Sequence, residues 1–167
     1  TMATQRLLSI PGVGMITASL LATKLGDGKN YAGSRDFAAS TGLVPRQYST
    51  GGKNTLMGIS KRGDKNLRRL LVQCARAFMQ RLEHNPGRLA EWVKIQLTRH
   101  HSNVVACGLA NKLARIAWAI TAHRTVLANK KRWQLELSAL WIPSYDLVLR
   151  RLIMMTERHS DLLMNLT

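Results

Sequence analysis

Acidic residues are scarce in this chain of 167 residues. Nine Asp and Glu stand against 25 Lys and Arg, which gives a formal net charge of +16 and an isoelectric point near 11.1. The nine carboxylates are scattered singly, whereas metal-dependent nucleases and glycosidases need clustered carboxylates. The sequence therefore predicts no metal site of its own, and any metal-assisted chemistry would take its carboxylates from elsewhere.

Cysteine is also rare, and neither of the two cysteines has a CxxC partner. Cys74 and Cys107 lie in apolar stretches of helical period, which favours a reducing, cytoplasmic compartment. The five histidines include no pair at the i, i+4 spacing that binds zinc. Disulfide scaffolds and helical zinc sites are therefore excluded.

Long uncharged hydrophobic runs are missing, although 46% of the residues are hydrophobic. The most apolar stretch, residues 104–122, is interrupted by Asn111, Lys112 and Arg115. The first residues also lack the charged and apolar regions of a secretory signal. We expect no membrane span and no membrane partner.

The positive charge itself is the main feature of the sequence. The hydrophobic content is sufficient for a folded core, so the charge is not that of a disordered basic tail. A folded surface this positive fits a polyanionic partner, and nucleic acid is the partner that the composition favours.

Apolar residues recur at spacings of three and four almost throughout, and this period predicts an all-α protein. Ser34 and Asp64 are candidate N-caps, and Gly42 and Asn85-Pro86-Gly87 are candidate helix ends. The helices that we expect cover residues 3–9, 13–25, 34–40, 65–82, 88–99 and 103–123, then a short helix that ends near 141 and a last one over 145–166.

Residues 46–63 show no helical period and contain four glycines, so we expect a long, glycine-rich, basic loop. Residues 46–81 hold nine Lys and Arg against Asp64 alone, a local net charge of +8. The loop and the helix after it are therefore the best candidate for a phosphate-binding surface. The candidate residues for nucleic-acid binding are Arg46, Gly51, Gly52, Lys53, Ser60, Lys61, Arg62, Lys65, Arg68 and Arg69. The alternative is an ordinary solvated basic face.

The segment Ile10-Pro11-Gly12-Val13-Gly14 between the first two helices has the pattern of a helix-hairpin-helix. Gly12 and Gly14 would let the backbone turn tightly and approach a phosphate, while the second helix points its free N–H groups at it. The alternative is a tight corner between two helices whose glycines serve packing.

The segment Ser49-Thr50-Gly51-Gly52-Lys53 places two hydroxyls and a cation on one glycine-rich stretch. It is no P-loop, because that motif requires Gly at position 47 and Ser or Thr at position 54. A hydroxyl beside a partly neutralised phosphodiester is suited to nucleophilic attack when a base assists it. From spacing alone, ordinary hydrogen bonding by Ser49 is the more common outcome. The four tryptophans fall on helical faces and are expected in the core rather than as base-stacking platforms.

Three motifs in this order and spacing resemble the C-terminal catalytic domain of DEDD-type serine transposases of bacterial insertion sequences, the bridge-RNA-guided recombinases. The motifs are IPGVGMITASLLATKLGD, FAASTGLVPRQYSTGGK and GISKRGDKNLRRLLVQCARA, and the resemblance covers about residues 4–125. It implies a helical domain whose serine attacks DNA and forms a covalent phosphoserine intermediate. It also implies DNA and a structured guide RNA as partners, homo-oligomeric assembly and a bacterial, cytoplasmic location.

The resemblance assigns the nucleophile to Ser49, the serine after the tyrosine, with Thr50 as the second candidate. Many relatives carry a serine directly before the glycine, where this chain has Thr50. We favour Ser49 because a primary hydroxyl is the less hindered nucleophile.

The resemblance divides the chain into a helix-hairpin-helix over 1–28, a serine-bearing helical catalytic domain over 29–129 and a C-terminal helical extension over 130–167. It also implies a preceding RuvC-like domain that supplies four acidic residues and Mg²⁺, and this domain is absent from the sequence. We therefore expect the chain alone to bind no cofactor and to bind nucleic acid, but to be inactive or nearly so in strand transfer. The alternatives are a non-catalytic helix-hairpin-helix nucleic-acid-binding protein and a helical oligomerisation module with incidental charge.

Overall fold

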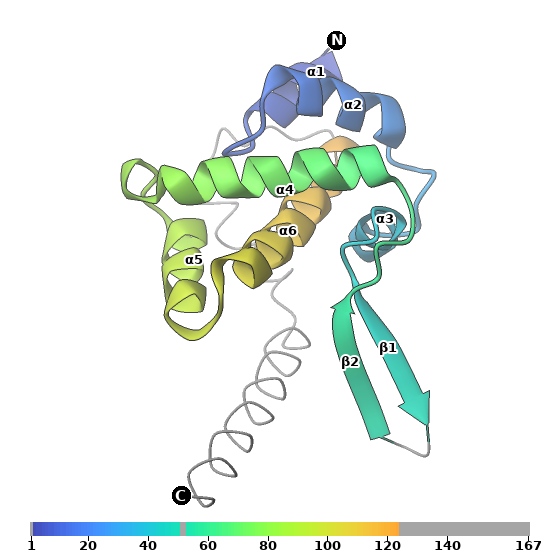
Figure 1. Cartoon of the computed structure of the whole chain (residues 1–167). Helices are drawn as coiled ribbons and strands as arrows, with labels where there is room; N and C mark the ends of the chain where they lie inside the picture. The colour runs from blue at the N-terminus through green and yellow to red at the C-terminus, as the bar shows by residue number, and fades with distance from the viewer. Residues whose placement is uncertain (1, 51–52, 124–167) are drawn as a thin grey trace, which may run out of the picture. The chain divides into compact units, whose positions relative to one another are not determined.

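The computed structural model describes residues 2–50 and 53–123. The helices expected near residue 141 and over 145–166 lie outside these ranges, as do Gly51 and Gly52. The described part is mostly helical, which confirms the predicted fold class (Figure 1). Its elements are α1 (Met2–Leu8), α2 (Met15–Leu25), α3 (Ser34–Ser40), β1 (Pro45–Thr50), β2 (Lys53–Ile59), α4 (Lys65–Gln80), η1 (Leu82–His84), α5 (Arg88–Arg99) and α6 (Ser102–Ala122).

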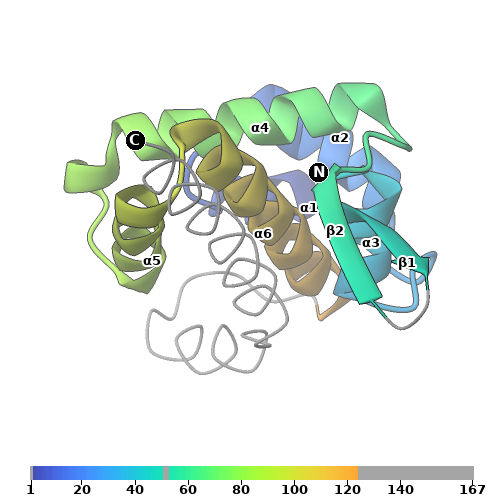
Figure 2. The ribbon, with the colours of Figure 1, turned by 60° about the horizontal axis from the view of Figure 1, so that its bottom comes forward.

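Helix α6 forms the centre of the core and packs against each of the helices α1 to α5 (Figures 1 and 2). Its apolar residues recur at helical spacing, and Leu109, Leu113 and Ile120 are fully buried. Alanines at 110, 114 and 117 are buried between them and leave room for the neighbouring helices to approach. By length and composition alone α6 could cross a membrane, but it is mostly buried inside the protein, as the core helix of a globular protein is.

The helix boundaries follow local signals that the sequence contains. The carboxylate of Asp64 caps α4, because its Oδ1 accepts hydrogen bonds from the backbone N–H groups of Asn66 and Leu67, both at 3.0 Å. The prediction for Ser34 is wrong: the N-cap of α3 is Gly33, no side chain caps this helix, and Ser34 is its first residue. Extended backbone at Gly33 makes the entry to α3 without a hydroxyl cap.

The expected loop over residues 46–63 is a β-hairpin over most of its length. Strands β1 and β2 are antiparallel, and the register pairs Tyr48 with Thr55 and Thr50 with Lys53. The irregular step between Pro45 and Gln47 leaves the register uneven near the base of the hairpin. The side chains from Arg46 to Tyr48 are exposed in succession, so this part of β1 shows no alternation of buried and exposed residues that the sequence could have revealed.

The described tryptophans, Trp92 and Trp118, are half-buried and not part of the fully buried core, and both make contacts within the protein. The indole N–H of Trp118 donates to the carbonyl oxygen of Gly28 at 3.1 Å, and Trp92 lies under the ammonium group of Lys112, 4.2 Å from the ring centroid. Burial and, to a smaller extent, the nearby charge of Arg115 together lower the pKa of Lys112 to about 8. These two rings therefore join α6 to the chain around it.

Candidate nucleic-acid interface

The hairpin joins the helices through a short segment, Ser40 to Val44, which we call the clasp. Each of its five successive carbonyl oxygens accepts a hydrogen bond from a residue later in the chain. The N–H of Asp64 donates to Ser40 at 3.1 Å, and Nη1 of Arg68 donates to Thr41 at 2.9 Å. Gly42 accepts from the N–H of Lys61 at 3.1 Å and from Oγ of Ser60 at 3.3 Å. Nδ2 of Asn111 donates to Leu43 at 3.4 Å, and the N–H of Ser60 donates to Val44 at 2.8 Å. The clasp thus connects the hairpin to both α4 and α6.

Two glycines make this close approach possible. Gly42 has φ +71° and Gly63 has φ +102°, backbone values that residues other than glycine rarely adopt. A Cβ atom at Gly42 would overlap the carbonyl oxygen of Arg62, and one at Gly63 would overlap that of Ser40. The two chain segments at the base of the hairpin therefore lie in direct backbone contact.

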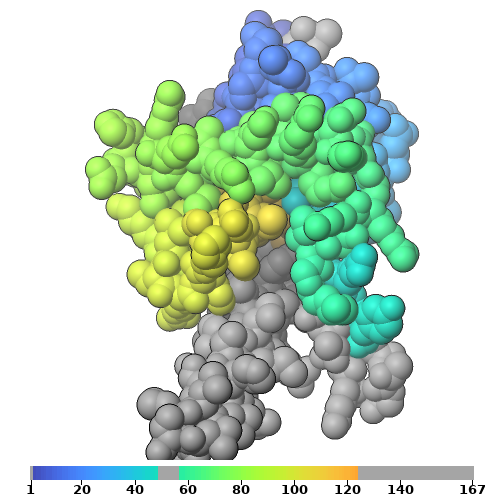
Figure 3. Space-filling view, viewed as in Figure 1, coloured from blue at the N-terminus to red at the C-terminus, as the bar shows by residue number. Residues whose placement is uncertain are grey.

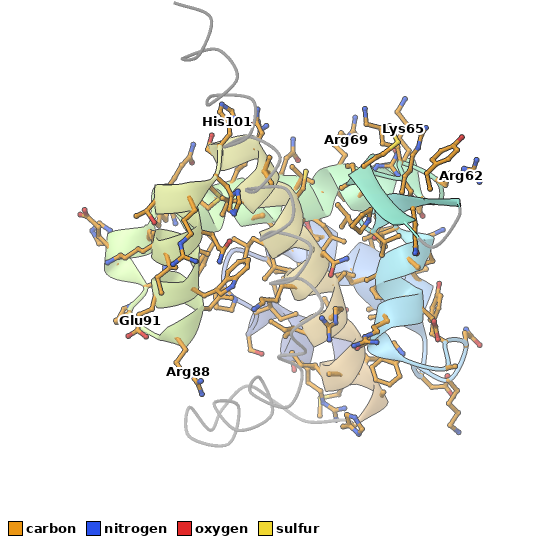
Figure 4. All side chains as sticks on the ribbon, turned by 90° about the horizontal axis from the view of Figure 1, so that it is seen from below. Arg62, Lys65, Arg69, Arg88, Glu91 and His101 are labelled. Carbon is orange, nitrogen blue, oxygen red and sulfur yellow. The ribbon has the colours of Figure 1, made fainter. Side chains whose placement is uncertain are left out.

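The exposed side of α4 carries a stripe of basic and amide side chains. Lys65, Arg69, Gln73, Arg76 and Gln80 are all exposed and recur at spacings of three and four. Figure 3 shows α4 lying across one face of the protein, and Figure 4 shows Arg62, Lys65 and Arg69 gathered beside the hairpin. We call Arg62, Lys65, Arg69 and Arg76 the basic stripe.

The one carboxylate next to the basic stripe has its own partners. Asp64 caps α4 and forms an ion pair with Lys24, with 2.9 Å between Nζ and Oδ2. The hydrogen bond from the N–H of Leu67 and the contact with Lys24 hold the pKa of Asp64 below its usual value, while the same contact raises the pKa of Lys24. The carboxylate therefore stays ionised and serves α4 rather than a metal ion.

Not all the predicted phosphate ligands share this surface. Arg68 is half-buried, and its guanidinium points to Thr41 in the clasp. Ser60 is half-buried too and donates to Gly42. By contrast, Arg46, Lys61 and Arg62 are exposed at the ends of the hairpin strands.

The predicted nucleophile lies at the far end of the hairpin. Ser49 and Thr50 are the last two positions of β1, paired in register with Asn54 and Lys53, so the backbone brings Lys53 opposite Thr50. In Figure 1 this end of the hairpin extends away from α3 and α4. The structure thus places both candidate hydroxyl residues at a projecting position.

The two glycines of the expected helix-hairpin-helix differ in their surroundings. Gly12 has φ +82°, and a Cβ atom there would lie 2.6 Å from the carbonyl oxygen of Cys74 and 3.1 Å from Cβ of Phe78. Gly12 therefore permits close packing of this turn on α4. Gly14 is exposed at the start of α2, and a Cβ atom there would meet nothing within 4 Å.

Across residues 2–50 and 53–123, no three His, Cys, Asp or Glu side chains come together in a way that could hold a metal ion. Cys107 is half-buried, and burial raises the pKa of its thiol while the charges of Arg76 and Lys61 act against the rise. We therefore assign neither a metal nor a reactive thiol to the part of the chain described.

Comparison with known proteins decides the family. Residues 4–92 match the family described as "Transposase IS116/IS110/IS902 family", a range that runs from α1 into α5 and includes the hairpin and the basic stripe. This chain belongs to that transposase family.

Members of the transposase family from several bacteria resemble this chain. The transposase for insertion sequence element IS1328 of Yersinia enterocolitica is 82% identical over 125 residues, which is 75% of this chain and 37% of that protein. A probable family 20 transposase of Pseudomonas aeruginosa is 47% identical over 121 residues, 72% of this chain and 36% of that protein. The transposase for IS1111A of Coxiella burnetii is 43% identical over 120 residues, 72% and 33% of the two chains. The matched region thus spans about a third of the length of these transposases.

Sequence reasoning missed several residues of the candidate interface. Tyr48 and Met57 are exposed on the hairpin by 63% and 49%, and Arg76 extends the basic stripe toward the end of α4, where it donates to Oδ1 of Asn103 at 3.0 Å. The spacing of Arg76 from Arg69 could have identified it. Asn111, far away in sequence and buried, gave no signal of its contact with the clasp.

Proposed function

We propose that this chain is the part of an insertion-sequence transposase that binds the DNA backbone and supplies the nucleophile for strand transfer, with Ser49 as that nucleophile. The observation that carries the proposal is the position of Ser49 on a hairpin that projects beside the basic stripe, in a chain of this family. Lys65 and Arg69 would bind phosphate groups at the base of the hairpin while its far end reaches the scissile bond.

The chemistry is transfer of a phosphodiester from DNA to the protein. Oγ of Ser49 attacks phosphorus and forms a new P–O bond, while the bond from phosphorus to the departing deoxyribose oxygen breaks. The seryl proton passes to a base, and the departing oxygen takes a proton from the surroundings. Attack by a freed hydroxyl of another strand reverses these steps and joins the strands. Cations near the hairpin, such as Lys53, stabilise the charge that develops on the phosphoryl oxygens.

The resemblance adds the partners of this proposal. A structured guide RNA would select the DNA, and the protein would act as a homo-oligomer. The resemblance also implies an acidic domain that would hold Mg²⁺.

The proposal is tested in a full-length protein. The matching region of the Yersinia transposase is replaced by this chain, and the hybrid is incubated with labelled DNA that carries the ends of the element. A covalent protein–DNA adduct on a denaturing gel is the expected result. Trypsin would cut after Arg46 and Lys53, so a single peptide over residues 47–53 would carry the bound phosphate, and fragmentation would identify its residue.

Three variants assign the nucleophile. Ser49→Ala should abolish the adduct, whereas Thr50→Val and Ser19→Ala, a matched change at an exposed serine of α2, should retain it. Loss of the adduct in Thr50→Val alone would make Thr50 the nucleophile and overturn the assignment. Cleavage of DNA without any adduct would overturn the covalent mechanism, and salt-sensitive binding without cleavage would favour a non-catalytic binding protein.

A further inference from the structure

We propose that Arg68 and Asn111 are positioning residues, which orient the hairpin through the clasp and bind no DNA themselves. The effect on strand transfer rests on the function proposed above, whereas the effect on the hairpin can be measured without it. Arg68 is among the residues that the sequence predicts to bind phosphate, so the inference changes its role.

The clasp needs its donors because it is buried. Thr41 is 0% exposed and Leu43 is 2% exposed, so their carbonyl oxygens have no ready access to water. Buried carbonyl groups require a hydrogen-bond partner, and a lost partner is costly. Arg68 from α4 provides the partner of Thr41, and Asn111 from α6 provides that of Leu43.

Arg68 and Asn111 lie on different helices and donate to two clasp residues that are two positions apart. Asn111 is 3% exposed in the centre of α6, so it cannot reach DNA. Nη1 of Arg68 donates a hydrogen bond to the clasp, while the next residue, Arg69, lies exposed in the basic stripe. Together they connect the entry of β1 to the two helices that form the largest helix contact of the core.

The direction in which the hairpin projects from the helices is set by the contacts at its base. Its strands pair with each other, and Figure 1 shows them extending beyond the helices. A strand of six residues is about 20 Å long, so a tilt of about 10° at the base moves the far end by about 3 Å. A misplacement of about 1 Å can slow an enzymatic step by about 100-fold. Small changes in the clasp would therefore reach Ser49.

The first test follows hydrogen exchange in the isolated chain. The N–H groups of Ser60, Lys61 and Asp64 donate to the clasp, so exchange over residues 58–64 reports its integrity. We expect Arg68→Met and Asn111→Leu to accelerate exchange there by about tenfold, with exchange in α5 unchanged. Arg68→Lys, which keeps a donor, should restore most of the protection.

Arg69→Met is the matched control for this test. It removes the same side chain from the next position, and because Arg69 is exposed it should leave exchange over residues 58–64 unchanged. Equal exchange in the parent chain, Arg68→Met and Asn111→Leu would overturn the inference. If Arg68→Met accelerates exchange in α5 as well, this variant has unfolded globally and cannot report on the clasp. Asn111→Leu is then the decisive variant. Unchanged exchange over residues 58–64 in Asn111→Leu would reject the inference.

The second test separates binding from reaction in the hybrid transposase. Arg68→Met should leave DNA affinity within about twofold while it slows adduct formation at saturating DNA by about 100-fold. Arg69→Met should weaken affinity and lower its salt dependence by about 0.9. If the two variants behave alike in affinity and salt dependence, Arg68 binds phosphate and is no positioning residue. Should the parent hybrid form no adduct, the proposed function fails, while the exchange result still decides the clasp.

Discussion

The hairpin and helix α6 are stabilised in opposite ways. Helix α6 contacts every other helix from α1 to α5 and buries most of its side chains, whereas the hairpin exposes Arg46, Gln47 and Tyr48 and is attached at its base through carbonyl hydrogen bonds. Burial of apolar surface provides most of the free energy of folding, so the stability of this domain resides in α6. The proposed chemistry lies on the hairpin, whose described side chains at Arg46, Gln47, Tyr48 and Met57 are exposed. Sequence changes in the hairpin can therefore alter function at little cost to the fold.

The largest effect should come from a cavity in α6. Leu109→Ala removes a fully buried side chain and is expected to lower the free energy of unfolding by about 2–5 kcal/mol. Urea denaturation followed by circular dichroism measures this change. On the hairpin, Met57→Ala should change stability by less than about 0.5 kcal/mol, since Met57 is 49% exposed. Comparable losses in the two variants would refute the contrast between the two regions.

A second effect tests the junction between the regions. Gly63→Ala places a Cβ atom against the carbonyl oxygen of Ser40 at a left-handed backbone position, and should cost about 1–3 kcal/mol. Gly58→Ala is the control, because a Cβ atom at Gly58 would meet nothing within 4 Å. Denaturation midpoints compare the two. A stable Gly63→Ala protein with unchanged exchange at the clasp would mean that the close backbone contact is dispensable.

The helical part of the fold could be predicted because its signals are local. Residues 34–40 and 88–99 were expected as helices and form α3 and α5 with these bounds, and Asp64 caps α4 as its position indicated. The hairpin could not be predicted from alternation, since Arg46, Gln47 and Tyr48 are exposed in succession on β1. The Gly51-Gly52 pair between two short segments was the available signal for a two-residue turn, although its own conformation lies outside the described residues.

For the candidate site, the sequence predicted which cations lie near the hairpin, but not which of them are exposed and which form hydrogen bonds inside the protein. The exposed members, Lys65 and Arg69, follow from the polar face of α4, and the structure brings Arg62 beside them. The inward turn of Arg68 depends on the carbonyl oxygen of Thr41, which is 27 positions away. Spacing within one helix contains no information on such a partner, so Arg68 and Arg69 are equivalent in the sequence and differ in the fold.

The largely buried charge of Lys112 on α6 makes the stability of the folded protein depend on pH. In the folded protein burial lowers the pKa of Lys112 to about 8, while an unfolded lysine titrates near about 10.4. Between these values the unfolded chain binds more protons, so stability rises as the pH increases from about 8 to about 10, by about 1–2 kcal/mol. Urea denaturation at pH 7 and 10 measures the rise, and Lys112→Met should reduce it. An equal rise in both proteins would assign the effect to other groups.

The cap of α4 gives a smaller effect, and it lies at acidic instead of basic pH. The folded-state pKa of Asp64 is lowered, so its contribution is present above the unfolded value of about 3.9 and is lost as the pH falls through the folded value. Asp64→Ala should cost about 1 kcal/mol at pH 7 and less at pH 2, where the carboxylate takes up its proton. Asp64→Asn keeps an acceptor for the N–H groups and loses the ion pair with Lys24, which separates the two contributions. A cost of Asp64→Ala that persists unchanged at pH 2 would show that the ionised carboxylate is not its source.

The smallest effect concerns one cation of the basic stripe. Each phosphate contact contributes a slope of about 0.9 to the fall of log affinity with log salt, so Arg69→Gln should reduce the slope for duplex DNA by that amount. Between 50 and 200 mM salt this corresponds to about a threefold smaller loss of affinity. Lys94→Gln on α5 removes an exposed charge away from the hairpin and should leave the slope nearly unchanged. The pair isolates position from net charge, because both variants lose one positive charge. If both variants reduce the salt slope equally, DNA affinity depends on the overall charge of the chain. The basic stripe would then not be the surface that binds DNA phosphates beside the hairpin.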